Sequence, residues 1–149
     1  GWIINNLIDS VAKGGNFMVG IGPDGDGRFL PEAIDQLRGV GKWLKVNGEG
    51  IYATRPREGE LWQEGEKIRF TRTKDNRTVF AFCLGWPGDT LILKSVRAGK
   101  NAKVFLMGIK KPLKWENTQS GLEIRLNEKM KSQIDINTGG IAYGFRIEV

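Results

Sequence analysis

GGNFMVGIGPDGDG, residues 14–27, is an apolar run that begins after two glycines and ends at a glycine, a proline and two aspartates. Its apolar residues are consecutive rather than alternating, as in a strand that is covered on both faces. A helical pattern lies on each side of the run. The sequence therefore predicts a buried strand between two helices, which is the repeating unit of a parallel α/β sheet.

The two helical patterns cover residues 3–13 and residues 31–47. The first lacks a capping residue, since Gly1-Trp2 leads directly into it, so we expect the chain to start partway along an element. The second begins at Pro31 and stops at Asn47-Gly48. A doubly covered strand needs paired neighbours on both edges, which two helices cannot supply. We expect residues 1 to about 50 to be the last helix-strand-helix unit of a TIM-like barrel.

From Ile51 onward the apolar pattern has a period of two, which is typical of half-buried strands. Glycine, asparagine and aspartate clusters separate the alternating segments. These segments are residues 67–72, 78–84, 91–96, 103–107, 121–126 and 142–149. They predict an antiparallel β-sandwich and a chain that is mainly β overall. Residues 55–59 resemble a linker, so we predict a barrel unit at 1–56 and a sandwich domain at 57–149.

Composition excludes several classes of function. The formal charge is +6, but the Lys and Arg residues of the second half are spread along it, as on solvated strand faces, rather than gathered as in a nucleic-acid-binding protein. The chain has no histidine and a single cysteine, Cys83, which rules out internal Ser-His and Cys-His pairs and His-ligated zinc. No apolar run is long enough for a membrane span. We expect no cofactor, no metal, no nucleic acid and no membrane partner.

The glycine-rich loop contains two motifs that invite a functional interpretation. Residues 20–25 fit the dinucleotide-binding pattern G-x-G-x-x-G, but the next helix starts only at Pro31, and Pro23 removes an amide. Asp24 and Asp26 resemble the start of a calcium loop that lacks its other ligands. They could also form a carboxylate pair at the C-terminal end of a barrel strand, where active sites lie. Turn formation is the simpler interpretation.

Five tryptophans could be packed or could bind sugar. Trp2 and Trp43 accompany helical patterns, and we expect both to be packed. Trp62, Trp86 and Trp115 belong to the strand-rich part, where a sugar-stacking platform is an alternative to burial in the core or at an edge. We favour burial for all three.

Residues 7–27 (LIDSVAKGGNFMVGIGPDGDG) and residues 40–56 (VGKWLKVNGEGIYATRP) closely resemble the end of the catalytic barrel in α-L-fucosidases of glycoside hydrolase family 29. The strand-rich remainder fits the C-terminal β-sandwich that follows the barrel in that family. Gly20 departs from the family pattern, which commonly has an asparagine just before the Ile-Gly-Pro turn.

The resemblance implies a retaining exo-hydrolase that removes terminal α-linked L-fucose from glycans through a covalent glycosyl-enzyme. In this family the nucleophile and the acid/base lie on earlier barrel strands, so we expect no catalytic residue in this chain and no activity from it alone. The loop of Gly22, Pro23, Asp24 and Asp26 would adjoin the substrate site.

The partners implied are fucosylated glycans, through the parent enzyme, and the missing barrel portion or a partner chain. A secreted, periplasmic or lysosomal location is expected from the resemblance. The alternative is a non-catalytic module, either carbohydrate-binding or structural.

Overall fold

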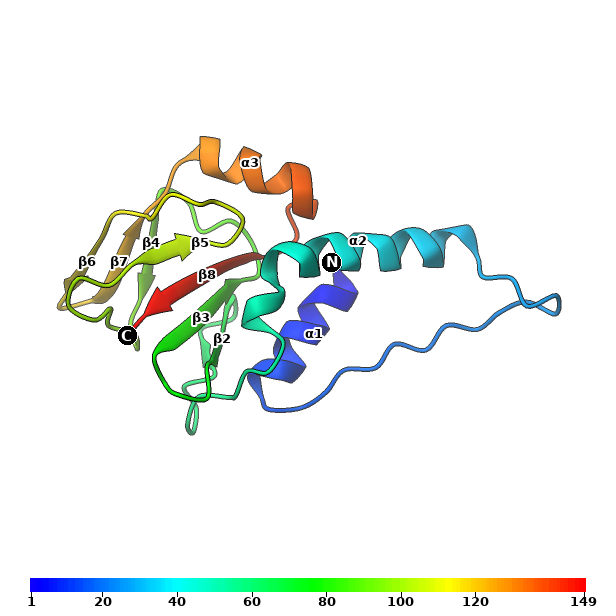
Figure 1. Cartoon of the computed structure of the whole chain (residues 1–149), viewed down its shortest axis with the longest axis horizontal. Coiled ribbons are helices and arrows are strands. Elements are labelled where there is room, and N and C mark those ends of the chain that lie inside the picture. Colours follow the sequence, from blue (N-terminus) through cyan, green and yellow to red (C-terminus); the bar gives the residue numbers. More distant parts are fainter.

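The first third of the chain contains two helices joined by an extended arm, and all of the strands follow it, in a computed structural model that describes all of residues 1–149 (Figure 1). The elements are α1 (Trp2–Ala12), α2 (Pro31–Asn47), a short 3-10 helix η1 (Gly48–Gly50), β1 (Gln63–Glu64), β2 (Ile68–Arg72), β3 (Thr78–Cys83), β4 (Thr90–Leu93), β5 (Val104–Leu106), β6 (Trp115–Thr118), β7 (Gly121–Arg125), α3 (Glu128–Thr138) and β8 (Tyr143–Glu148).

The strands form two antiparallel sheets. The larger has the order β1-β2-β3-β8-β5 and the smaller has the order β4-β7-β6. The last strand of the chain, β8, therefore lies inside the larger sheet, where it pairs with β3 on one side and with β5 on the other. The predicted antiparallel sandwich is confirmed, and each of the six predicted strands is present. No helix has the length and apolar character that crossing a bilayer requires.

Strand β3 is buried on both faces, and its period of two sends alternate side chains into two different cores. Val79, Ala81 and Cys83 belong to the core between the two sheets, which also contains Leu93 of β4 and Leu122 of β7. The sandwich is therefore held by apolar side chains that both sheets contribute.

The opposite face of β3 packs against the helices. Phe80 and Phe82 share a second core with Ile4 and Ile8 of α1 and with Trp43 of α2. The Nε1–H of Trp43, which is fully buried, donates a hydrogen bond to the carbonyl oxygen of Ala142 at 3.0 Å. Helices α1 and α2 thus cover the outer face of the five-stranded sheet (Figure 1).

Gly144 in β8 permits the close approach of α2. A Cβ atom at this position would overlap Oδ1 of Asn47 and would come within 3.1 Å of the Phe82 ring. The absence of a side chain lets the C-terminal end of α2 lie directly on the sheet, where Asn47 is almost completely buried.

The strand expected in residues 14–27 does not form. The segment after α1 runs outward as an extended arm, turns at its tip and returns to α2 (Figure 1). Met18 is 91% exposed, and Phe17, Val19 and Ile21 are only partly covered. No neighbouring strand is present to pair with the backbone N–H and C=O groups of the arm, so the apolar run has no sheet to enter.

Two further features differ from the sequence-based expectations. Trp2 is 69% exposed rather than packed, and its ring makes a T-shaped contact with Phe17 at 6.0 Å between ring centroids. Helix α3 was not predicted. It lies beside the C-terminal end of α2, and Ile134 is its buried apolar anchor in the core between the sheets (Figure 1).

Candidate functional site

The loop predicted to adjoin a substrate lies at the exposed tip of the arm. One carboxylate oxygen of Asp24 accepts hydrogen bonds from the amides of Asp26 at 2.9 Å and Arg28 at 2.8 Å. The amide of Asp24 in turn donates to the carbonyl oxygen of Arg28 at 2.8 Å. Asp24 therefore holds the turn, and it shares no bridging partner with Asp26. It stays a prediction that this loop adjoins a sugar site through Gly22, Pro23, Asp24 and Asp26.

A shallow apolar cleft of about 320 Å³ lies at the base of the arm, between the arm and the first turns of α1 and α2. Trp2, Ile3, Ile21, Leu30 and Leu37 line it, and no ionisable side chain does. A Cβ atom at Gly20, beside this cleft, would meet no atom within 4 Å. The arrangement can bury apolar surface, but it offers no group for acid–base or nucleophilic chemistry.

The single thiol of the chain, Cys83, is buried between the two sheets. Burial, assisted by the charge of Glu64, raises the pKa of the Cys83 thiol to about 12, so the thiol stays protonated at neutral pH. The interpretation of Cys83 as a small buried thiol is confirmed, since it is 2% exposed. No group of three or more Cys, Asp or Glu side chains is placed to hold a metal ion.

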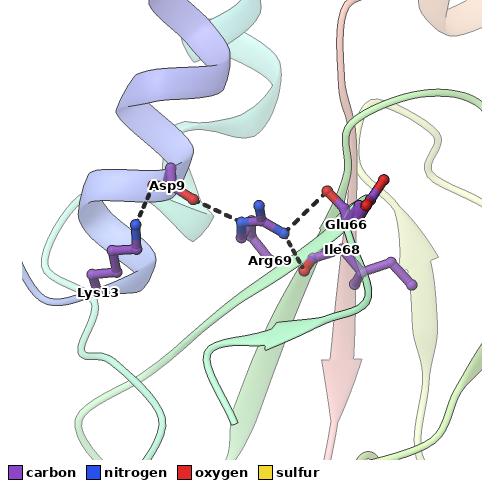
Figure 2. Close-up of polar contacts among 5 residues, drawn as sticks. All are labelled: Asp9, Lys13, Glu66, Ile68 and Arg69. Carbon is purple, nitrogen blue, oxygen red and sulfur yellow. Dashed lines mark hydrogen bonds and ion pairs between the residues drawn. The ribbon is translucent and has the colours of Figure 1, made fainter. Parts of the chain in front are cut away.

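A charged cluster joins α1 to the sandwich (Figure 2). The carboxylate of Asp9 accepts hydrogen bonds from Nζ of Lys13 at 2.7 Å and from Nε of Arg69 in β2 at 2.8 Å. Both cations also lie over the ring of Trp62, at 4.7 and 5.2 Å from its centroid. We call Asp9, Lys13, Trp62 and Arg69 the α1–β2 clamp.

The α1–β2 clamp fixes the helix from which the arm departs. Partial burial opposes ionisation of Asp9, but the hydrogen bonds and charges of Lys13 and Arg69 outweigh it and lower the pKa of Asp9. No role for Asp9 was predicted from the sequence. The Asp9-to-Lys13 spacing of four residues was the available signal, whereas the partner in β2 is 60 residues away.

The predicted linker is anchored at Arg57. Its guanidinium donates to Oγ and to the carbonyl oxygen of Ser95, each at 2.8 Å, and lies 4.9 Å from the centroid of the Phe70 ring. Glu64 accepts hydrogen bonds from the amide of Ser95 at 2.7 Å and from the amide of Lys94 at 2.9 Å. Burial lowers the pKa of Arg57, although the charge of Glu64 works in the opposite direction. The segment that leads into the sandwich is therefore tied to the loop after β4.

The three tryptophans of the strand-rich part are all half-buried, and each serves different neighbours. Trp62 belongs to the α1–β2 clamp. The ring of Trp86 meets the edge of Tyr143 at 5.0 Å between centroids, and Nε1 of Trp115 donates to the carbonyl oxygen of Ala102 at 3.0 Å. Trp86 and Trp115 pack against the core between the sheets, as expected, whereas Trp62 lies outside both cores.

Comparison with known proteins adds independent findings. Residues 1–49 match a family model described as alpha-L-fucosidase, and residues 63–148 match one described as the alpha-L-fucosidase C-terminal domain. The chain is 40% identical over 121 residues to the tissue alpha-L-fucosidase of Bos taurus, an alignment that covers 80% of this chain and 25% of that protein. It is 34% identical over 134 residues to the tissue alpha-L-fucosidase of Homo sapiens, covering 89% and 28%.

Among solved structures, the chain resembles the alpha-fucosidase of Thermotoga maritima in complex with a mechanism-based inhibitor. The TM-score is 0.80 at 27% identity, over 99% of this chain and 34% of that one. The chain thus spans between a quarter and a third of the length of these relatives. The likeness confirms the predicted fold class, an α/β fragment followed by an antiparallel β-sandwich. Both family models and the structural likeness show that the chain belongs to the α-L-fucosidase family.

Proposed function

We propose that this chain is the C-terminal part of a retaining exo-α-L-fucosidase, which hydrolyses terminal α-linked L-fucose from glycans. The single observation that carries the proposal is the order and packing of the two matched regions. The helices of the first matched region share one core with the strands of the second, through Trp43 and Ile8 on one side and Phe80 and Phe82 on the other. The two regions are thus joined as parts of one folded unit.

The catalytic pair lies outside these residues in our proposal. A retaining glycosidase needs an ionised nucleophile and a protonated acid about 5 Å apart. Partial burial opposes ionisation of Asp9 and Asp135, but hydrogen bonds from their neighbours outweigh it and lower the pKa of both. Hydrogen bonds from Thr73 and from the Arg77 amide lower the pKa of Asp75. Each of these carboxyls is ionised at neutral pH, which is opposite to what a general acid requires.

In this proposal the chain gives structural support to the catalytic barrel of the parent enzyme. Residues 1–56 form the terminal barrel unit and residues 57–149 the sandwich, and the shared core and the α1–β2 clamp hold the two in a fixed relation. The apolar arm and the 320 Å³ cleft at its base would meet the remaining barrel, and fucosylated glycans would be engaged by the parent enzyme. An apolar surface of this kind favours a protein partner over open solvent.

The test is an assay of the polypeptide as its gene encodes it. Released fucose should appear first as the α anomer, observed by NMR before mutarotation, because a double displacement retains configuration. Release of the β anomer would contradict the retaining mechanism. No release of fucose from any α-L-fucoside would contradict the proposal as a whole.

A further inference from the structure

A basic cleft of about 780 Å³ lies where the segment after β5 meets the end of β7 and the first turns of α3. Five cationic side chains line it, Lys110, Lys111, Lys114, Arg125 and Lys129, and no carboxylate does. Its volume falls within the range of roughly 300–1,000 Å³ that small-molecule sites occupy. The function proposed above leaves this cleft without a role.

The lysines of the cleft are not neutralised by partners within the chain. Arg125 forms an ion pair with Glu123 at 3.0 Å, but none of the four lysines has a carboxylate oxygen within 4.0 Å. The formal charge of the whole chain is +6, so a large share of its unbalanced positive charge faces one concavity. Converging like charges raise the local potential and favour an anionic ligand.

Helix α3 adds to the same potential. Its N-cap, Asn127, lines the cleft and accepts a hydrogen bond from the amide of Met130 at 2.9 Å. The earlier amides of the first turn have no acceptor within the helix, so the positive end of the helix dipole lies at the cleft. Glu128 belongs to the same turn but does not line the cleft.

The floor and the polar groups of the cleft fit a saccharide. Leu113 and Leu126 are buried beneath it, and Met130 is half-buried. Such a floor can cover the apolar face of a sugar ring, while the amide of Gln133 can bond to hydroxyl groups. None of the lining residues is aromatic, so the cleft lacks the stacking surfaces typical of single-stranded nucleic-acid sites.

We propose that this cleft binds anionic glycans, that is, oligosaccharides that carry sulfate or carboxylate groups. The saccharide identity of the ligand rests on the proposed function of the parent as a glycan hydrolase. The anionic character rests on the four unpaired lysines and on the helix terminus. Lys110, Lys111 and Lys129 would contact the acidic groups directly.

The experiment is calorimetric titration of the full 149-residue chain with a sulfated fuco-oligosaccharide and with its desulfated form. We expect saturable binding of the sulfated form alone, weakened as NaCl is raised from about 50 to about 500 mM, because salt screens exposed charges. The triple variant Lys110→Ala/Lys111→Ala/Lys129→Ala should lose roughly tenfold in affinity, since each exposed charge contact contributes a few-fold.

The matched control is Lys67→Ala/Lys74→Ala/Lys100→Ala, which removes the same charge from exposed positions outside the cleft. Its affinity should stay within about twofold of the parent chain, and thermal melts should show both variants folded. No saturable binding, an equal loss in both variants, or equal affinity for the desulfated sugar would overturn the proposal. Equally tight binding of a DNA oligonucleotide of matched charge would also overturn it, by showing a general polyanion site. Because no step requires hydrolysis, failure here leaves the proposed fucosidase function untouched.

Discussion

Asp9 ties helix α1 electrostatically to the sandwich, and the ion pair between Glu49 of η1 and Arg146 of β8 is a second such link. Its side chain is 32% exposed and that of Arg69 is 13% exposed, so solvent screens the pair only partly. The Trp62 ring beneath both cations keeps them in place. A surface ion pair alone contributes little to stability, but here the carboxylate has two cationic partners and an aromatic support.

We expect Asp9→Asn to lower the free energy of unfolding by roughly 0.5–1 kcal/mol at pH 7, after allowance for solvent screening. The folded-state pKa of Asp9 lies below its ordinary value of 3.8, so its stabilising effect is present above that pH. The effect is lost as the pH falls through the folded-state pKa. Urea denaturation at pH 7 and at a series of pH values below 3.8 should show the difference between the two proteins shrinking as the pH falls. Asp35→Asn, at an exposed pair separated by 3.8 Å, should change nothing. A deficit for Asp9→Asn that persists undiminished in acid would contradict an electrostatic role.

Trp86 packs against the core between the two sheets, where its ring contacts that of Tyr143. We expect Trp86→Ala to lower stability by roughly 3 kcal/mol, as the loss of a large packed aromatic usually does, with no loss of glycan affinity. Trp86→Phe should cost far less, because it keeps the ring against Tyr143 and removes a buried Nε1–H that has no acceptor. Trp2→Ala, at a 69% exposed position, is the control for thermal melts. Loss of glycan binding at an unchanged melting temperature would instead make Trp86 part of a sugar site.

Helices and strands with a clear pattern of apolar residues could be predicted from the sequence. Those with few apolar residues could not. β3 and β8 are rich in apolar and aromatic residues that are buried in the structure, so both were found within a residue or two. β6 has mostly exposed polar residues and no alternation to detect. In α3 only Ile134 is a fully buried apolar residue, while Ile136 is 84% exposed, so no apolar stripe marks the helix.

The start of α3 depends on its cap. Asn127→Ala should lower the free energy of unfolding by about 1 kcal/mol, because the amide of Met130 loses its acceptor. Asn137→Ala makes the same chemical change at an exposed position of the same helix and should be close to neutral. Chemical denaturation of both variants measures the difference. Equal effects would show that the cap does not determine the stability of α3.

At the scale of the whole molecule, two cores are complete and one apolar surface is open. The core between the sheets and the core under α1 and α2 are both sealed by side chains of this chain. The arm and the N-terminal half of α2 are not, since Met18, Leu30 and Leu37 are 91%, 66% and 41% exposed. The apolar run of residues 14–27 could be recognised from the sequence, but no strand of this chain pairs with it.

The open surface should make the isolated chain bind a hydrophobic dye or self-associate, because apolar patches beyond a few hundred Å² rarely stay bare. The triple variant Met18→Ser/Leu30→Ser/Leu37→Ser should reduce both effects, as measured by dye fluorescence and sedimentation velocity. Ile92→Ser/Ile136→Ser, at exposed positions of the sandwich part, is the matched control and should reduce neither. A monomer without dye binding would count against a surface built to meet the rest of a barrel.

We propose that this chain supports an α-L-fucosidase without supplying its catalytic residues. The most direct test is the rate at which the rigorously purified 149-residue chain hydrolyses an aryl α-L-fucoside, with an active α-L-fucosidase as the positive control. We predict no turnover above the buffer blank, and no change on Asp24→Asn or Asp26→Asn. Turnover that either substitution abolishes would contradict the claim and would place the catalytic carboxylates in the loop at the tip of the arm.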